Sequence, residues 1–226
     1  MTKTLFFIFA LSVSLAACQS QHEKTVIGAA YNSELTKALQ QHQKVFNKKR
    51  AVLTFDSGAS AQSCDEYIHL MATTALKEDI NNQLAKSEYL LCDVLALTGD
   101  NKLSEEEHDV SFGQALADRL DLRSFPSSLS QMLDEQKNSL SQLDATALKV
   151  DATAVTYETE DWRYRLELVA TLDVNNNDTP DWLLWLADEA KTGNYRQYQT
   201  LIIYDTSETG PMSATPFTAT MNAQRK

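Results

Sequence analysis

The spacing of apolar residues changes once along this chain of 226 residues, near Leu148, and that change limits the fold more than any other feature. Before it, apolar residues recur every three or four positions, as Tyr67 and Met71 do, which places them on one side of an α-helix. After it, apolar and polar residues alternate, which is the pattern of a half-buried β-strand. The chain therefore predicts an α+β fold, with a helical region over residues 33–143 and a mostly antiparallel β region over residues 148–226.

The β region contains two long apolar runs. In the first run, alternate residues form one apolar face: Trp162, Tyr164, Leu166, Leu168, Ala170 and Leu172. The second run, residues 182–187, is apolar on both faces, so we expect this strand inside the sheet. The helical region is expected to end with a helix that begins at Pro126 and carries Leu129, Met132 and Leu133 on one face.

The first residues read as an export signal. Lys3 precedes an apolar run that ends near Ala17, and this run is too short for a helix that crosses a bilayer about 30 Å thick. The stretch Leu-Ala-Ala-Cys that ends at Cys18 resembles the lipobox of bacterial lipoproteins. The resemblance implies a signal peptide over residues 1–17, cleavage before Cys18, and a diacylglycerol thioether with fatty acyl chains such as palmitate. A buried cysteine at the end of a core helix is the alternative.

The same resemblance implies a location. Gln19 follows the cysteine, where an Asp would signal retention in the inner membrane, so the family rule implies an outer-membrane protein that faces the periplasm. Residues 18–32 then form the lipidated cysteine and its tether. The chain carries 20 Lys and Arg against 31 Asp and Glu, a net charge of −11, so neither nucleic acid nor an anionic lipid surface is an expected partner.

Two cysteines remain once Cys18 is assigned to lipid. Cys64 and Cys92 lie on apolar helical faces, and the polar stretch 77–82 between them predicts a turn at the midpoint. In an oxidising compartment such a pair predicts a disulfide across a helical hairpin. A reactive thiol is the alternative, but neither a CxxC motif nor a nearby paired histidine accompanies these residues.

One loop of the β region has the residue types of a metal site. Counted from its first residue, side-chain oxygens stand at positions 1, 3, 5 and 9, and position 7 offers a backbone carbonyl; the five are Asp173, Asn175, Asn177, Asp181 and, for the carbonyl, Thr179. Oxygen ligands at this spacing favour Ca²⁺ over Mg²⁺, zinc or copper. A polar turn whose side chains bond their own backbone is the alternative.

This loop, residues 173–181, resembles the Asp-x-Asp-x-Asp-Gly-x-x-Asp calcium loops of FG-GAP-type repeats and related EF-hand-like hairpins. It departs from them because Asp178 stands at the usual glycine, Asn replaces Asp at two positions, and Leu184 stands where EF-hands carry Glu. Only two carboxylates remain among the expected ligands, so the resemblance implies weak binding and a structural role.

Three functions remain open from the sequence. The leading hypothesis is a non-enzymatic outer-membrane lipoprotein that binds an envelope protein or glycan. The second is an envelope hydrolase of glycan or peptide that uses carboxylates such as Asp161, Asp188 or Glu189 near the sheet edge. The third is a structural spacer. The four histidines form no metal motif, and no catalytic residue is predicted.

Overall fold

The computed structural model describes residues 28–99, 103–105, 111–206 and 209–218. The expected signal peptide and Cys18 lie outside these ranges. Within them, no helix is both long enough and apolar enough to cross a membrane.

Six α-helices and eleven strands lie in the described residues. The helices are α1 (Ser33–Gln40), α2 (His42–Phe46), α3 (Cys64–Met71), α4 (Ile80–Ala85), α5 (Leu90–Thr98) and α6 (Phe112–Arg119). The strands are β1 (Gly28–Ala30), β2 (Leu53–Thr54), β3 (Ser60–Ala61), β4 (Ser104–Glu105), β5 (Leu120–Asp121), β6 (Leu148–Val150), β7 (Ala154–Glu158), β8 (Trp162–Leu172), β9 (Asp181–Ala190), β10 (Arg196–Ile203) and β11 (Met212–Pro216). Five 3-10 helices complete the set: η1 (Lys86–Tyr89), η2 (Leu122–Ser124), η3 (Ser128–Met132), η4 (Leu140–Gln142) and η5 (Ala145–Ala147).

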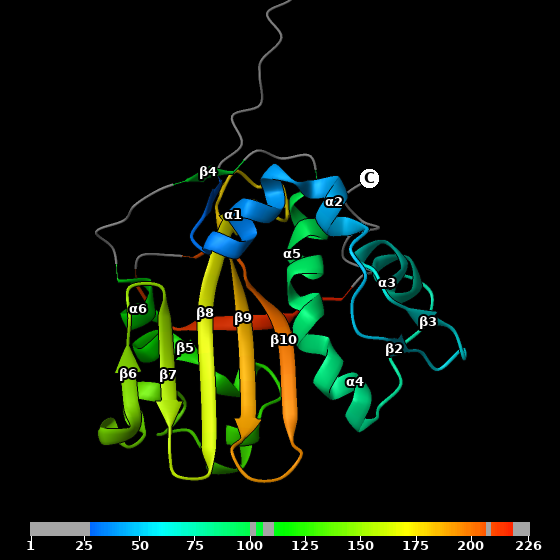
Figure 1. The fold of residues 1–226 in the computed structure, drawn as a ribbon. Helices are drawn as coiled ribbons and strands as arrows, with labels where there is room; N and C mark the ends of the chain where they lie inside the picture. Colours follow the sequence, from blue (N-terminus) through cyan, green and yellow to red (C-terminus); the bar gives the residue numbers. More distant parts are fainter. Residues whose placement is uncertain (1–27, 100–102, 106–110, 207–208, 219–226) are drawn as a thin grey trace, which may run out of the picture.

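Nine of the strands form one sheet. Its order is β4-β1-β8-β9-β10-β11-β5, and β7 joins β8 on the same side as β1 while β6 joins β7. The pairs β1–β4 and β11–β5 are parallel and all other pairs are antiparallel. Figure 1 shows the long strands β8, β9 and β10 side by side, with α1 across one end and α4 and α5 beside β10. The predicted α+β fold with a mostly antiparallel sheet is confirmed.

The central strand β8 supplies residues to two hydrophobic cores. Leu168 pairs with Leu184 and Ala170 pairs with Leu183, so one residue between them, Val169, is extra and forms a β-bulge. Leu168 packs with α6 in the first core, whereas Val169 and Ala170 pack with α1 and α5 in the second. The single apolar face predicted for this strand is therefore wrong beyond the bulge, because the extra residue reverses which face each side chain takes.

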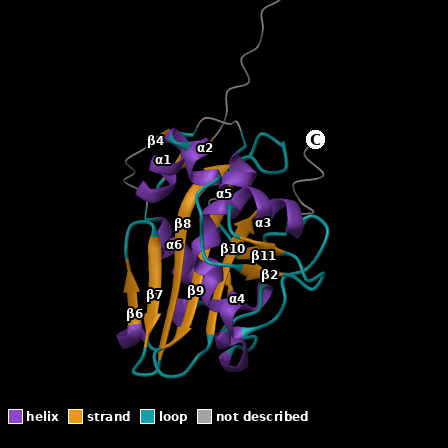
Figure 2. Cartoon of the chain, turned by 45° about the vertical axis from the view of Figure 1, so that its right-hand side comes forward, coloured by secondary structure: helices purple, strands orange, loops and turns teal. Residues whose placement is uncertain are grey.

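The neighbouring strand β9 confirms the prediction of a strand buried on both faces. Leu184 and Leu186 belong to the first core and Leu183 belongs to the second, and all three are fully buried. The sheet is thus the middle layer of the molecule, with α6 and the 3-10 helices η2 to η5 on one face and α1 and α5 on the other. Figure 2 shows helices on both sides of the strands.

The region predicted as helical differs from the prediction in two ways. It contains strands: β4 and β5 join the main sheet, and β2 and β3 form a small hairpin. Its last part, after α6, forms only 3-10 helices, and Met132 is 49% exposed instead of buried on a helix face. The Ser127 backbone N–H donates to the Ser130 hydroxyl, as in a capping box that begins a helix, but the segment continues only as the short 3-10 helix η3. Part of the expected tether also belongs to the sheet, as β1.

The predicted disulfide is confirmed. Cys64 at the start of α3 and Cys92 in α5 are bonded, with their Cα atoms 5.1 Å apart. The hairpin differs from the prediction in detail, because α3 ends at Met71 and the return segment consists of α4, η1 and α5. Asp79 begins α4 by accepting a hydrogen bond from the Asn82 N–H, which places the helix start within the predicted turn.

Candidate functional site

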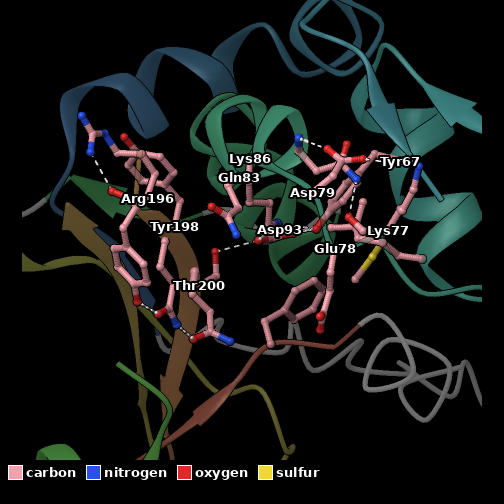
Figure 3. A pocket seen from close by; sticks show the side chains of 17 residues that line it. Tyr67, Lys77, Glu78, Asp79, Gln83, Lys86, Asp93, Arg196, Tyr198 and Thr200 are labelled. Atoms are coloured by element: carbon pink, nitrogen blue, oxygen red, sulfur yellow. Dashed lines mark hydrogen bonds and ion pairs between the residues drawn. The ribbon is translucent and has the colours of Figure 1, made fainter. Parts of the chain in front are cut away.

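A groove beside β10 is the main candidate site in the described residues. It has a volume of about 560 Å³. One wall is β10 itself, from Arg196 to Thr200, and the other comes from α3, α4, α5 and the turn before α4. Figure 3 shows Arg196, Tyr198 and Thr200 on one side of the groove and Lys77, Glu78 and Asp79 on the other. Volumes of this size are typical of ligand sites.

The groove exists because β11 covers only part of β10. The two strands pair from Ile203 down to Leu201, and the Phe217 N–H still donates to the Thr200 carbonyl at 2.8 Å. Below Thr200 no described strand lies beside this edge of β10. On the other edge, β9 pairs with β10 along its whole length, from Arg196 to Ile203.

Backbone groups of β10 point into this groove. The Ala190 N–H donates to the Tyr195 carbonyl, so residue 195 directs its backbone groups toward β9. Direction alternates along a strand, and Thr200 directs its carbonyl the other way, toward Phe217. Arg196 and Tyr198 therefore direct their N–H and C=O groups into the groove, because the register with β9 is unbroken.

A buried carboxylate lies beneath the groove. Asp93 of α5 is 1% exposed and accepts three hydrogen bonds. The donors are the Tyr67 hydroxyl at 2.8 Å, the Thr200 hydroxyl at 2.8 Å and the Lys86 ammonium at 2.9 Å. Figure 3 shows Asp93 between Lys86 and Thr200. Lys86 also donates to the Tyr67 hydroxyl, so these four side chains form one network that joins α3, η1, α5 and β10.

The side chains of this network hydrogen-bond to one another, which favours a structural role over a catalytic one. The pKa of Tyr67 lies well above its usual value, first because the phenol is buried and second because Asp93 is close, so Tyr67 remains a neutral donor. Both oxygens of Asp93 accept hydrogen bonds from side chains of the protein. The arrangement holds α5 against the sheet and forms a polar floor for the groove.

The exposed charges of the groove are less fully paired. Lys77 approaches Asp79 at 3.9 Å, at the outer limit of an ion pair. Arg196 donates to the carbonyls of Tyr195 and Ala190, and none of the ion pairs in the described residues includes it. A half-buried guanidinium bound only to carbonyls is suited to receive a carboxylate from a ligand.

The Asp/Asn loop, residues 173–181, joins β8 to β9 and closes on itself. Asp173 accepts the N–H groups of Asn177 at 3.0 Å and Asp178 at 2.9 Å. Asp178 has φ = +64°, the left-handed conformation that the usual glycine adopts at this position. Asn177 also accepts the Thr179 N–H at 2.9 Å. The loop thus makes a tight turn with a left-handed residue at Asp178.

A carboxylate from outside the loop completes its surroundings. The side-chain amides of Asn175 and Asn177 both donate to one oxygen of Asp205, which follows β10. Asp181 is fully buried and accepts the N–H groups of Val174 at 2.7 Å and Asp205 at 2.9 Å. Burial raises the pKa of Asp181 above its usual value, and these N–H bonds oppose that rise.

These contacts determine which groups of the loop are available as ligands of a metal ion. No group of three His, Cys, Asp or Glu side chains with metal-site geometry occurs in the described residues. The expected ligand set also uses Asn oxygens and the Thr179 carbonyl. Asp173 and Asp205 each accept a hydrogen bond from Asn177. Each carboxylate oxygen has more than one lone pair, so it can accept a hydrogen bond and still bind an ion. The donor set is therefore compatible with a hard cation, although Asp181 is already engaged by backbone N–H groups.

The three carboxylates considered for hydrolysis have different surroundings. Asp188 is fully buried and accepts the N–H of Ser128 at 2.7 Å and the indole N–H of Trp162 at 2.5 Å. Glu189, the next residue of β9, points to the opposite face and accepts from the Tyr198 hydroxyl. Asp161 lines a second cavity of about 470 Å³ and is the only one of the three in it. Asp188 and Glu189 therefore face opposite sides of the sheet, and of the three only Asp161 lines the second cavity.

Several other polar and aromatic side chains of the sheet have partners within the fold. Arg165 pairs with Glu167 at 3.1 Å. Trp182 packs edge-to-face against Phe112, with ring centroids 5.1 Å apart. Trp162 packs against Tyr195 beside the second cavity, with centroids 5.2 Å apart.

Sequence reasoning missed the network beneath the groove. A signal for it was present, because Asp93 is the only charged residue in the apolar run Leu-Leu-Cys-Asp-Val-Leu-Ala-Leu, residues 90–97. A charge within such a run requires a partner, and Lys86 stands seven residues earlier, two helical turns away. The open edge of β10 had no such signal, because pairing depends on where β11 leaves the sheet.

Comparisons with protein-family models, with curated proteins and with solved structures found no match.

Proposed function

We propose that this chain is a lipid-anchored lipoprotein of the outer membrane whose folded part is a non-enzymatic binding module facing the periplasm. The observation that carries the proposal is the Cys64–Cys92 disulfide. It supports an oxidising compartment. It also accounts for two of the chain's three cysteines, which leaves Cys18, within the lipobox-like stretch, without a cysteine to pair with in the same chain.

The position of the fold agrees with an anchor at Cys18. The first described strand, β1, begins at Gly28, ten residues after Cys18. Ten residues reach at most about 35 Å when fully extended. The globular part would then stay close to the bilayer, where envelope components are available for binding.

Binding is favoured over catalysis by the state of the buried groups. The groove beside β10 has the volume of a ligand site and offers unpaired backbone groups and Arg196. The buried carboxylates Asp93 and Asp188 instead accept several hydrogen bonds each from the protein. We therefore place ligand binding in the groove.

The anchor is tested by metabolic labelling with radioactive palmitate and by mass spectrometry of the mature amino terminus. The full chain is expected to incorporate label, to begin at Cys18 and to fractionate with outer membranes. The Cys18→Ala variant is expected to lose label and membrane association. The Cys64→Ser variant serves as the control, because it also lacks a cysteine but keeps the lipobox. A native protein that begins at Met1 with a free thiol at Cys18 would contradict the proposal.

The binding role is tested by photo-cross-linking in envelope extracts. A photoreactive amino acid at Gln83 faces the groove, whereas one at the neighbouring Leu84, which is 52% exposed, does not line it. We expect a discrete cross-linked product from the first position that is absent from the second. Equal products from both positions would show that the groove has no ligand.

The second hypothesis, an envelope hydrolase, rests on Asp161 beside the aromatic residues of the second cavity. A retaining or inverting glycosidase needs a second carboxylate within about 5–10 Å. An Asp161→Asn variant that abolishes hydrolysis of envelope glycan or peptide would favour this function over binding.

We further propose that the loop 173–181 holds a structural Ca²⁺ through Asp173, Asn175, Asn177, Asp181 and the Thr179 carbonyl, aided by Asp205. Support comes from the left-handed turn at Asp178 and from the convergence of both asparagines on Asp205. Millimolar Ca²⁺ is expected to raise the melting temperature of the full chain in detergent, and Asp205→Asn to reduce that rise. An unchanged melting temperature in calorimetry would contradict the metal site.

A further inference from the structure

We propose that the free edge of β10, from Arg196 to Tyr198, is a docking site for an extended peptide strand of another protein, with an acidic side chain opposite Arg196. The inference rests on the proposed binding function and names the class of ligand that the groove accepts. It follows from the backbone groups in the groove, the length of the open edge and the side chains on each side of it.

The backbone of the edge offers four hydrogen-bonding groups. The N–H and C=O groups of Arg196 and Tyr198 point into the groove, and in the described residues neither a backbone nor a side-chain partner bonds to them. Unpaired edges of this kind are templates for another strand. An incoming strand that pairs with the edge gains main-chain hydrogen bonds that do not depend on its sequence.

The groove has the dimensions of a short strand. Five consecutive residues of β10, from Arg196 to Thr200, line it. Thr200 is already paired with Phe217, so the open edge from Arg196 to Gln199 accepts about four residues of an antiparallel partner at about 3.4 Å per residue. The Phe217 N–H already bonds to the Thr200 carbonyl, so an added strand would begin where β11 ends.

The side chains on the two faces of the β10 edge determine which peptide side chains fit opposite them. Arg196 and Tyr198 point to the face that carries α4 and α5, and Arg196 has no carboxylate partner in the described residues. An acidic residue directly opposite Arg196 would pair with it across the strands. On the other face, Gln197 accepts from the Tyr195 hydroxyl at 2.7 Å and donates to Gln199 at 3.4 Å. This row favours uncharged polar residues.

The same geometry defines a probe. Phe217 already stands opposite Thr200, so the probe begins opposite Tyr198, and in antiparallel register its first and third residues stand opposite Tyr198 and Arg196. Acetyl-Val-Thr-Glu-Thr-amide therefore places its acid opposite Arg196 and its first threonine opposite Gln197. Its third residue directs its N–H toward Arg196, whereas its second residue directs its N–H away from β10.

Binding of a fluorescent form of this peptide to the full chain in detergent micelles tests the proposal. We expect saturable binding that weakens about tenfold or more, the loss of about 1.4 kcal/mol, when Lys replaces Glu or when the third residue is N-methylated. N-methylation of the second residue should leave the affinity unchanged within about twofold. Equal affinity for both N-methylated peptides, or no binding at all, would overturn the proposal.

Two variants of the chain test the same edge from the other side. Tyr198→Pro removes one N–H that faces the groove and breaks no bond to β9, so the sheet is retained and peptide binding should fall about tenfold. Leu84→Ala, at an exposed position that does not line the groove, should bind like the unchanged chain. Circular dichroism checks that both variants fold, and if Tyr198→Pro does not, amide hydrogen exchange at Arg196 and Tyr198 of the unchanged chain must slow when peptide is added.

Other occupants give different results and would also overturn the proposal. Peptide binding that appears only in a chain truncated after Thr218 would assign the edge to the chain's own carboxyl-terminal segment. A dimer in sedimentation that Tyr198→Pro dissociates, with no peptide binding, would assign it to a second copy. A Gln83 cross-link that persists while peptide binding fails would contradict this inference alone, whereas loss of the cross-link contradicts the binding function itself.

Discussion

Asp93 and Asp188 are buried on opposite faces of the sheet, and their surroundings stabilise them differently. Asp93, on the face that carries α5, is 1% exposed and has a lysine among its three donors. Asp188, on the opposite face, is fully buried, and its donors in the described residues are all neutral: the N–H and hydroxyl of Ser128, the indole N–H of Trp162 and, at 3.4 Å, the hydroxyl of Tyr195.

The difference shows two ways to bury a negative charge. At Asp93 one cation, Lys86, compensates the charge, so the site depends on a single residue. At Asp188 several dipoles share the task, so each donor is individually less important. The first arrangement joins distant elements, η1, α5 and β10, whereas the second joins η3 to the end of β9.

Removing the cation should produce the largest effect. Lys86→Met leaves Asp93 buried without a compensating charge, and we expect a loss of about 3–5 kcal/mol in the free energy of unfolding. Urea denaturation followed by circular dichroism measures it. The double variant Lys86→Met with Asp93→Asn should recover most of the loss, because no charge is then buried. A double variant as unstable as the single one would show that Lys86 acts by packing and not by charge.

Breaking the disulfide should have the next largest effect, and only on the Asp93 face. The pair closes a loop with a sequence separation of 28, which corresponds to about 3–4 kcal/mol of stability. Tyr67 of α3 donates to Asp93 of α5, so we expect Cys64→Ser with Cys92→Ser to raise amide exchange in α3 and α5 first. Exchange in β9 near Asp188 serves as the internal reference. Uniform loss of protection on both faces would break the comparison.

Removing one dipole at Asp188 should cost less than removing the cation at Asp93. Trp162→Phe deletes the indole donor and keeps an aromatic ring, so we expect about 1.5–3 kcal/mol from one hydrogen bond to a charged group. Thermal or urea unfolding checks the value. A loss as large as that of Lys86→Met would mean that the donors of Asp188 are not independent.

Alkaline pH should give the smallest effect. Burial, aided by Asp188, raises the pKa of Tyr195 to about 12. In the unfolded chain the phenol ionises near pH 10, so its contribution is complete below about pH 10 and is lost as the pH rises toward about 12. We expect Tyr195→Phe to reduce the fall in stability between pH 9 and 11, measured by urea denaturation at each pH. An unchanged slope would place the alkaline dependence on other tyrosines.

Sequence alone predicted the features that depend on local spacing. The change of period near Leu148 predicted β6 to β10, and the two apolar faces of residues 182–187 predicted the central position of β9. The polar turn between Cys64 and Cys92 predicted their disulfide. In each case the pattern of a few neighbouring residues determines the outcome.

Features that depend on distant contacts were not predictable in the same way. Apolar residues continue to alternate in the sequence through Val169, but the β-bulge there reverses the faces in the structure, because the two ends of β8 pack into different cores. The strands β1, β4 and β5 are two or three residues long and receive their structure from the sheet they join. The groove forms because β11 ends at Pro216 and leaves the rest of β10 uncovered, and no local sequence pattern predicts this end.

Because of the bulge at Val169, the molecule cannot be divided into two separate parts, one for each core. One strand, β8, supplies Leu168 to the first core and Ala170 to the second, and it pairs with β1, β7 and β9. A shortened protein that keeps either half would expose the other half's apolar side chains along this strand. Deleting the single extra residue would exchange the inward and outward side chains over three positions, so evolution or engineering can vary the loops of this fold far more freely than the length of β8.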